Sequence, residues 1–279
     1  EAGDGGCSPR LFAPGAGGAL ARVGGGVGSR DDGGGASGPM AAAVHAALAA
    51  FIEHDSYPCV GAKSALKRGS YRLGLYAAMG SDGAVAASTR DLQWFARHAD
   101  EIDDAYATLA LAFDGPAFDD ERGFEAALWA HLRGVHEIDA RRHGWDPSVS
   151  SDPADPSFSF SVGGRAFFVV GMHPRASRAS RRFPFPALVC NLHSQFERLR
   201  ERGRYEAMTA TVRARDEALQ GEANPELRDF GEASEARQYS GRAHEAGWVA
   251  PFEAVDGSGG AAGRHEDAGV GEGGGGCPF

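Results

Sequence analysis

Long hydrophobic runs, lysines and paired cysteines are scarce in this chain of 279 residues. No stretch approaches the roughly 18–20 consecutive apolar residues that a membrane-spanning helix needs, so we expect no membrane partner. The four cysteines lie far apart and form no Cys-x-x-Cys pair. This argues against a disulfide framework and for free thiols in a reducing compartment, the cytoplasm. Lys63 and Lys67 are the only lysines among 28 basic residues, a bias from which we infer no function.

Signatures of several common protein classes are also missing. The sequence has no GxGxxG, P-loop, HExxH or GxSxG pattern. This removes support for dinucleotide-binding, nucleotide-hydrolysing, zinc-protease and α/β-hydrolase chemistry. A formal net charge of −10 disfavours nucleic acid as a general partner. What is present is an ordinary globular composition, with 42% hydrophobic and 24% charged residues.

Glycine divides the sequence into three parts. Residues 1–39 hold 14 of the 41 glycines, and residues 257–276 hold another 10. Both stretches have too few apolar residues to bury a core, so we predict that 1–39 and 257–276 are disordered, the latter within a glycine-rich tail at 253–279. Residues 40–252 then form a single domain. Arginines within 1–39 are compatible with an organelle leader, whereas aspartates in the same stretch argue against one.

Hydrophobic spacing predicts a mixture of helices and strands. Helices are predicted at 40–54, 62–68, 91–104, 124–142 and 193–219, the last broken near Gly203. Strands are predicted at 71–76, 107–113, 158–162, 166–170 and 187–190. Gly163 and Gly164 form a two-residue turn between two of these strands, which is typical of a β-hairpin. The order predicts an α+β fold, a single domain with a largely antiparallel sheet covered by helices.

A thiol stands between a proline and a predicted helix start in Tyr57-Pro58-Cys59. The amide groups at a helix N-terminus lower the pKa of a neighbouring thiol, which suits a nucleophile or a metal ligand. A lone cysteine is more often a small, buried apolar side chain. Both interpretations of Cys59 stay open at this point.

A basic loop follows the strongest predicted strand. It begins at His173 and carries Arg175, Arg178, Arg181 and Arg182. Guanidinium groups match carboxylate and phosphate oxygens, so the loop could clamp heme propionates, a phosphate ester or RNA. A solvated basic loop explains the same residues about equally well.

Two further segments carry candidate polar residues. His193 lies in the first turn of a helix that Asn191 would cap, and a structural role explains it more simply than catalysis. Glu232 and Glu235 lie in residues 229–242, where short polar side chains suit a loop lining a pocket. Their carboxylates could pair with the basic loop or with a cationic substrate. An exposed charged helix is the alternative.

Three motifs are long enough to be specific. They are YPCVGAKSAL (57–66), FFVVGMHPRASRASRRFPFPALVCNLHSQFERLR (167–200) and RYEAMTATVRARDEALQGEANPELRDFGEASEARQYSGRA (204–243). These motifs resemble the YqcI/YcgG family over about 50–252. The resemblance is closest to a branch of heme-dependent N-hydroxylases, in the guanitoxin and D-cycloserine pathways, that hydroxylate a guanidine nitrogen. Residues 40–252 would then be the catalytic domain.

The resemblance implies an oxidoreductase that binds heme b and hydroxylates a guanidino or amino compound such as L-arginine. An electron-donor protein would be a second partner. Cys59 is the favoured ligand of the heme iron, because thiolate ligation favours O–O cleavage; His173 is the alternative and His193 the third candidate. The four arginines of the basic loop would bind the propionates, and Glu232 and Glu235 would hold the guanidinium.

Two alternatives belong to other functional classes. One is a heme- or anion-binding protein without turnover. The other is a phosphate- or RNA-binding module that uses the loop from Arg175 to Arg182. The sequence also departs from the family at one place. Members typically end in Trp-x-Cys-Pro-Phe, whereas here Ala250 stands at the cysteine position and a Cys277-Pro278-Phe279 ending follows later.

Overall fold

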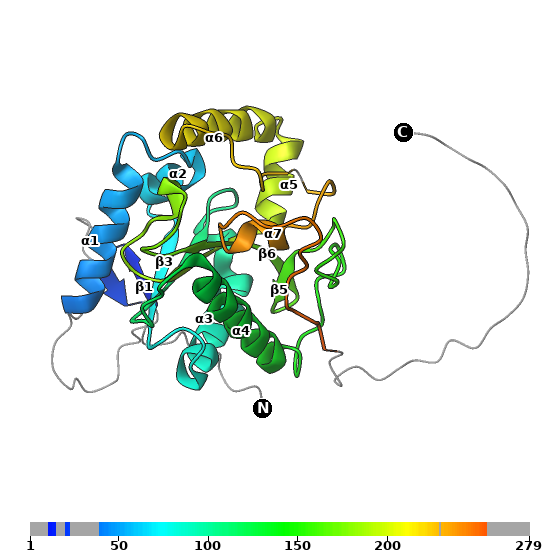
Figure 1. Ribbon diagram of the computed structural model, residues 1–279. Helices are drawn as coiled ribbons and strands as arrows, with labels where there is room; N and C mark the ends of the chain where they lie inside the picture. Colours follow the sequence, from blue (N-terminus) through cyan, green and yellow to red (C-terminus); the bar gives the residue numbers. More distant parts are fainter. Residues whose placement is uncertain (1–10, 15–19, 23–38, 229, 256–279) are drawn as a thin grey trace, which may run out of the picture.

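The computed structural model describes residues 11–14, 20–22, 39–228 and 230–255, and shows a sheet between helices (Figure 1). The helices are α1 (Pro39–Glu53), α2 (Val60–Arg68), α3 (Asp82–Ile102), α4 (Glu121–Asp139), α5 (His193–Glu201), α6 (Tyr205–Gln220) and α7 (Ala236–Tyr239). The strands are β1 (Leu11–Pro14), β2 (Leu20–Arg22), β3 (Tyr71–Tyr76), β4 (Thr108–Phe113), β5 (Phe160–Val162), β6 (Arg165–Met172) and β7 (Ala187–Leu192). No helix in these ranges is long and apolar enough to cross a bilayer.

The sheet has the strand order β2-β1-β3-β4-β7-β6-β5. Only β3 and β4 run parallel, joined by the crossover helix α3, and every other neighbouring pair is antiparallel. The predicted α+β class with a largely antiparallel sheet is therefore confirmed. The glycine turn after β5 also lies where the sequence predicted it, with both glycines at positive φ.

The prediction of disorder for residues 1–39 differs from the structure at two short strands. β1 and β2 pair with each other, and β1 adds to the edge of β3. An open sheet edge offers unpaired backbone N–H and C=O groups, so it can order a segment that has no core of its own. Pro39 belongs to α1. The rest of 1–38, and the tail from 256 onwards, lie outside the described residues.

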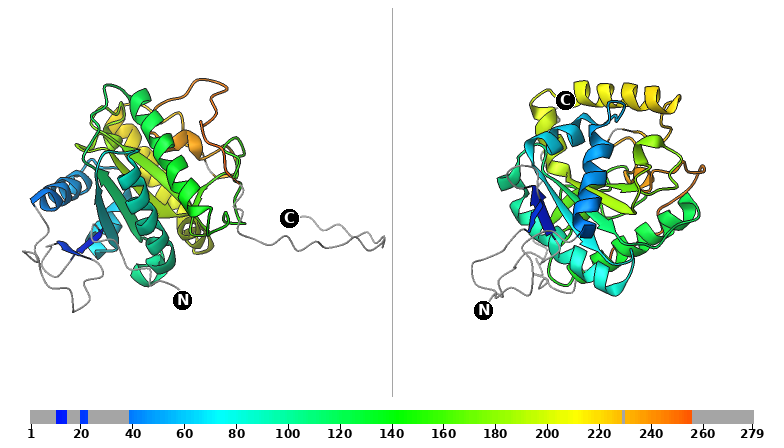
Figure 2. Two further views of the ribbon diagram at one scale, coloured as in Figure 1. Left: turned by 90° about the horizontal axis from the view of Figure 1, so that it is seen from below. Right: turned by 90° about the vertical axis from the view of Figure 1, so that its left-hand side faces the viewer.

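Helices cover both faces of the sheet (Figures 1 and 2). α3 and α4 pack side by side on one face, where Leu111, Val169 and Leu188 point into the larger core cluster. α1, α2, α5 and α6 lie on the opposite face. There a smaller apolar cluster gathers around Leu48 and Phe183. This cluster does not fill the whole interval between the sheet and these four helices, so space remains there.

The short helix α7 closes one side of that space. β5 pairs only with the first part of β6, and α7 packs against the part of β6 that follows. The buried hydroxyl of Tyr239 accepts from the N–H of Phe160 and donates to the carbonyl of Phe167, at 3.0 and 3.2 Å. Two strands are therefore tied to α7 through one side chain, and the segment before it is held close to the sheet.

Candidate functional site

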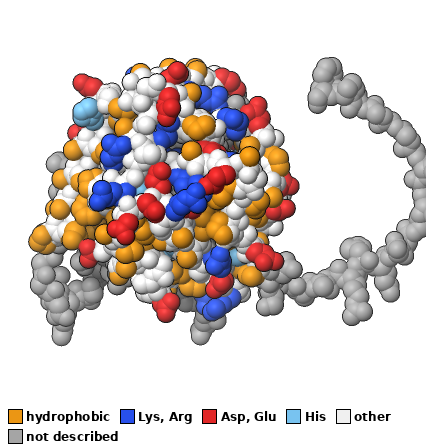
Figure 3. Space-filling model, in the orientation of Figure 1, with side chains coloured by type: hydrophobic (Ala, Val, Ile, Leu, Met, Phe, Trp, Pro, Cys, Tyr) orange, Lys and Arg blue, Asp and Glu red, His pale blue; other side chains and the backbone are white. Residues whose placement is uncertain are grey.

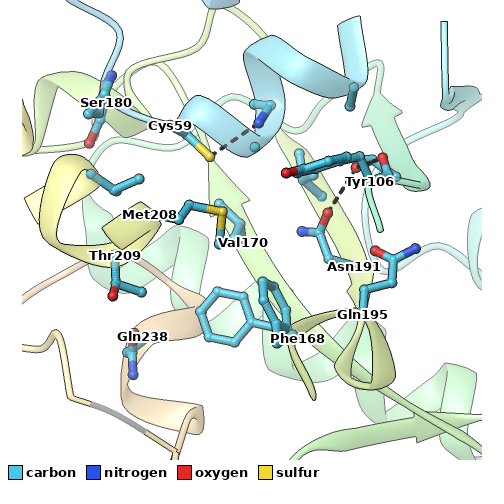
Figure 4. A pocket seen from close by; sticks show the side chains of 18 of the residues that line it. Cys59, Tyr106, Phe168, Val170, Ser180, Asn191, Gln195, Met208, Thr209 and Gln238 are labelled. Atoms are coloured by element: carbon cyan, nitrogen blue, oxygen red, sulfur yellow. Dashed lines mark hydrogen bonds between the residues drawn. The ribbon is translucent and has the colours of Figure 1, made fainter. Parts of the chain in front are cut away.

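A cavity of about 300 Å³ lies between the sheet and the helices α1, α2, α5 and α6. Its walls are mainly apolar: Val170 and Val189 come from the sheet, and Met208 and Val212 come from α6. Figure 4 shows Cys59, Met208, Val170 and Phe168 converging on this space from three elements, the start of α2, α6 and β6. A largely apolar cavity with a few polar groups is the usual form of a small-molecule site.

Cys59 lines the cavity as the N-cap of α2, so the sequence placed this residue correctly at a helix start. Its Sγ accepts the backbone N–H of Ala62 at 3.4 Å. The expected lowering of its pKa is wrong, however. Burial raises the pKa of the Cys59 thiol, and the N–H groups of Ala62 and Gly61 with the charge of Arg181 offset this only in part. The thiol sits too deep for the helix end to dominate.

His173 does not reach the cavity. Its ring is fully buried and stacks on Phe124 of α4 with 4.2 Å between ring centres, which places it with the core on the opposite face of the sheet. Its Nδ1 accepts the backbone N–H of Arg175 at 3.3 Å, and burial lowers its pKa. As a partner for a heme in the cavity, the alternative ligand His173 is therefore wrong: it lies on the other side of the sheet.

The basic loop does not form a four-arginine clamp. Arg178 is buried and paired with Asp216 of α6 at 2.6 Å. Arg182 turns back onto the loop and donates to the carbonyls of Ala176 and Ser177 at 3.0 and 2.9 Å. Arg175 is exposed and lines no part of the cavity. The clamp prediction is wrong for these three arginines. Arg178 binds α6, Arg182 binds the loop itself, and Arg175 lies outside the cavity.

Arg181 is the one arginine of the basic loop whose side chain lines the cavity. Its two guanidinium nitrogens donate to the carbonyls of Gly171 and Gln238 at 3.0 and 3.2 Å. Burial lowers its pKa, although the neighbouring Tyr57 and Asp216 oppose that effect. A positive charge is thus built into the wall close to Cys59.

The sequence predicted the same role for Glu232 and Glu235, but the structure places the two carboxylates differently. Glu235 lies just before α7, is buried and lines the cavity, and its Oε2 has no hydrogen-bond partner within the described residues. Glu232 is exposed and lines no part of the cavity. The interpretation of this segment as a pocket wall is therefore correct for Glu235 and wrong for Glu232. The two residues are only three positions apart, yet Glu235 lines the cavity and Glu232 is exposed.

His193 also lines the cavity, at the first residue of α5. Its Nε2 lies 3.2 Å from an oxygen of Glu197, and its Nδ1 lies 3.8 Å from Glu235. Because both ring nitrogens face carboxylates, we do not assign His193 as an iron ligand. Asn191 does not cap this helix as predicted; its Oδ1 accepts the hydroxyl of Thr108 at 2.9 Å.

Several cavity residues were not among the candidates that the sequence predicted, and Gln195, Arg213 and Arg228 are three of them. Gln195 is buried in the first turns of α5, and its Nε2 has no hydrogen-bond partner within the described residues. Arg213 and Arg228 are exposed and line the cavity from α6 and from the segment after it. The apolar stripe of α6, with Met208 and Val212 four residues apart, was a usable signal. It does not show whether a helix faces a core or a cavity.

The comparison with known families agrees with this arrangement. The profile of the YqcI/YcgG family matches residues 48–253, which includes every wall of the cavity. The chain belongs to the YqcI/YcgG family. No curated protein and no solved structure matches the chain. Ala250, at the position of the cysteine in the typical family ending, is buried in the core cluster beside α4 and does not line the cavity.

Proposed function

We propose that this YqcI/YcgG protein is a heme-dependent N-hydroxylase of a guanidino or amino compound, with heme b in the cavity. The observation that carries the proposal is that a thiol and a carboxylate line the same, largely apolar cavity. Cys59 offers a thiol on one wall, and Glu235 offers a buried carboxylate oxygen without a partner on another. The first suits iron and the second suits a cation.

The chemistry of the side chains that line the cavity suits a heme. Apolar residues from the sheet and from α6 supply two facing walls for a flat macrocycle. Arg181 supplies a half-buried cation, and Arg213 and Arg228 supply exposed ones, for the two propionates. Cys59 would hold the iron, which requires the thiol to lose its proton on binding. When bound, the heme supplies the oxidant that inserts an oxygen atom into a guanidine N–H bond.

Glu235 supports the choice of a cationic substrate. Among the described residues that line the cavity, Asp216 already accepts bonds from Arg178 and Ser180. Glu235 therefore has the carboxylate oxygen with the most freedom to accept a guanidinium or ammonium N–H. A charge-assisted bond of this kind both orients the nitrogen and offsets the loss of its hydration.

The reaction sets further requirements for the chain. One N–H group, one dioxygen molecule, two protons and two electrons give one N–OH group and one water. The electrons come from a reductant, for which we propose an electron-donor protein. Side chains of α6 line the cavity and would help to keep water from the reacting nitrogen.

The alternative of a phosphate- or RNA-binding module gains no support from the geometry. Arg178, Arg181 and Arg182 are all bonded within the protein, to a carboxylate or to backbone carbonyls. Figure 3 shows charges of both signs interspersed on the face in view, with hydrophobic side chains gathered over α1. A single-sign surface of the kind that attracts nucleic acid is not seen on this face.

The test begins with the absorption spectrum of the protein after expression with a heme precursor. We expect a Soret band that persists through gel filtration. Incubation with L-arginine, dioxygen and a chemical reductant should then give a product one oxygen atom heavier, seen by mass spectrometry. A colourless protein would overturn the proposal. A coloured protein that turns over no guanidino or amino compound would leave the non-catalytic heme-binding alternative.

A further inference from the structure

His193 forms a wall between the cavity and a second hollow. Together with Arg200 and Phe230 it lines both, and the second hollow also includes Ser148 and the half-exposed Glu197. The His193 side chain is only 8% exposed, so it is shielded although it borders the surface hollow. A titratable ring in this position has one side toward solvent and the other toward the interior.

Each ring nitrogen of His193 faces a different carboxylate. Nε2 lies 3.2 Å from Oε1 of Glu197, one turn along α5, and Nδ1 lies 3.8 Å from Oε1 of Glu235. The ring of Phe230 packs against the imidazole with 4.3 Å between ring centres and limits its rotation. The three groups therefore form a row that leads from the surface to the cavity.

The position of the protons on the His193 ring explains why this row of groups is suited to proton transfer. A neutral imidazole with its N–H toward Glu197 turns the lone pair of Nδ1 toward the carboxylate of Glu235, which is repulsive. A proton on Nδ1 turns this repulsion into attraction across the 3.8 Å between the two groups. Nδ1 has no hydrogen-bond partner within the described residues. The surrounding charges are Arg200, which pairs with Glu197, and Asp146, which interacts electrostatically with His193.

We infer that His193 is a proton-relay residue that moves protons from Glu197 at the surface to Glu235 in the cavity. The inference rests on the proposed function, because hydroxylation consumes two protons for each oxygen atom inserted. Nε2 takes a proton arriving at Glu197, and Nδ1 gives a proton to Oε1 of Glu235. Oε2 of Glu235, which has no hydrogen-bond partner within the described residues, is the oxygen left for the substrate. A proton on Oε1 removes the charge of the whole carboxylate, so Glu235 passes the proton on to the reaction before it again holds the substrate cation.

The first experiment needs neither heme nor substrate. Infrared spectra of the whole protein in the acidic range should contain a carboxylic-acid band that is lost in Glu235→Gln. After transfer to D₂O, this band should shift at least roughly tenfold more slowly in His193→Phe than in the wild type, because the relay is cut. Phenylalanine keeps the ring contact with Phe230. Glu197→Gln, which changes only the outer end, should slow the shift by less.

Two results would overturn the relay. One is an unchanged exchange rate in His193→Phe, and the other is the absence of any acid band sensitive to Glu235→Gln. If His193→Phe does not fold, His193→Gln provides the same comparison with a polar side chain that cannot accept and release a proton. These outcomes do not depend on turnover.

The second experiment separates the relay from the proposed function. With heme and L-arginine, His193→Phe should lower kcat by roughly tenfold or more while KM changes little, and its solvent isotope effect should exceed that of the wild type. If exchange is slowed but the wild type hydroxylates nothing, the relay stands and the proposed reaction is wrong. If the wild type turns over and His193→Phe matches it, the reaction stands and the relay is wrong.

Discussion

Arg178 and Asp216 form an ion pair of 2.6 Å whose two side chains are only 6% and 8% exposed. Arg178 belongs to the basic loop after β6, and Asp216 belongs to α6, the helix that covers the cavity. Ser180 donates a further bond of 2.7 Å to the same carboxylate. Asp216 is the one buried residue of α6, so this pair anchors the helix over the site.

Breaking this ion pair should destabilise the protein strongly. Asp216→Ala leaves the Arg178 guanidinium buried without its counter-charge, and we expect the free energy of unfolding to fall by about 3–5 kcal/mol. Glu217→Ala, at the exposed neighbouring position, is the matched control and should change it by about 0.5 kcal/mol or less. Urea unfolding followed by circular dichroism measures both. Equal stability of the two variants would contradict the anchoring role.

Glu235 and Glu232 should differ in their effect on substrate affinity. Removing one charge-assisted hydrogen bond costs about 1.5–3 kcal/mol, so Glu235→Gln should raise KM for the guanidino substrate by roughly 10- to 100-fold. The heme spectrum should stay the same. Glu232→Gln should leave KM unchanged because its side chain lies outside the cavity. A similar KM in all three proteins would place the cation elsewhere.

Cys59 should determine the ferrous–CO spectrum. A thiolate-ligated heme absorbs at a longer wavelength than a histidine-ligated one, and Cys59→Ser should abolish that feature. Because burial raises the pKa of this thiol, less thiolate is present at neutral pH than at an exposed cysteine. The apoprotein should therefore be alkylated slowly by iodoacetamide, and faster as the pH rises. A histidine-type spectrum in the wild type would contradict the assignment.

Arg181 and Arg182 are neighbours in sequence that should behave differently toward heme. Arg181→Met removes a half-buried charge from the cavity wall, so heme should dissociate faster into an apomyoglobin acceptor. Arg182→Ala removes only bonds to two loop carbonyls outside the cavity and should retain heme as the wild type does. If the two variants lose heme equally fast, the propionates do not depend on Arg181.

His131 should make stability depend on pH. It is fully buried between Ser88 and the backbone of Gly80, and burial lowers its pKa to about 4. Between pH 6.5 and 4 the unfolded chain binds a proton that the folded chain does not, so the free energy of unfolding falls with the pH, by about 3 kcal/mol over this window. His131→Asn should remove this part of the slope. The exposed His54→Asn, as control, should leave it intact.

The sequence by itself determined the elements whose signals are local. The strand predicted at 71–76 and the two-glycine turn after β5 both correspond to observed structure. Each depends on backbone preferences and side-chain periodicity within a few residues. α3 begins at Asp82 rather than at 91, because Ser81 caps a first turn rich in alanine that lacks a strong apolar pattern.

Only the tertiary structure decided which candidate residues meet. His173 follows β6 and Cys59 begins α2, yet the sheet separates them, because a chain leaving a strand can turn to either face. Glu235 reaches the cavity because α7 packs on the part of β6 that β5 leaves unpaired. The pKa of Cys59 is raised because the elements that enclose the cavity, among them α1, α6 and the sheet, shield the thiol from water. The sequence around Cys59 contains only the local helix end.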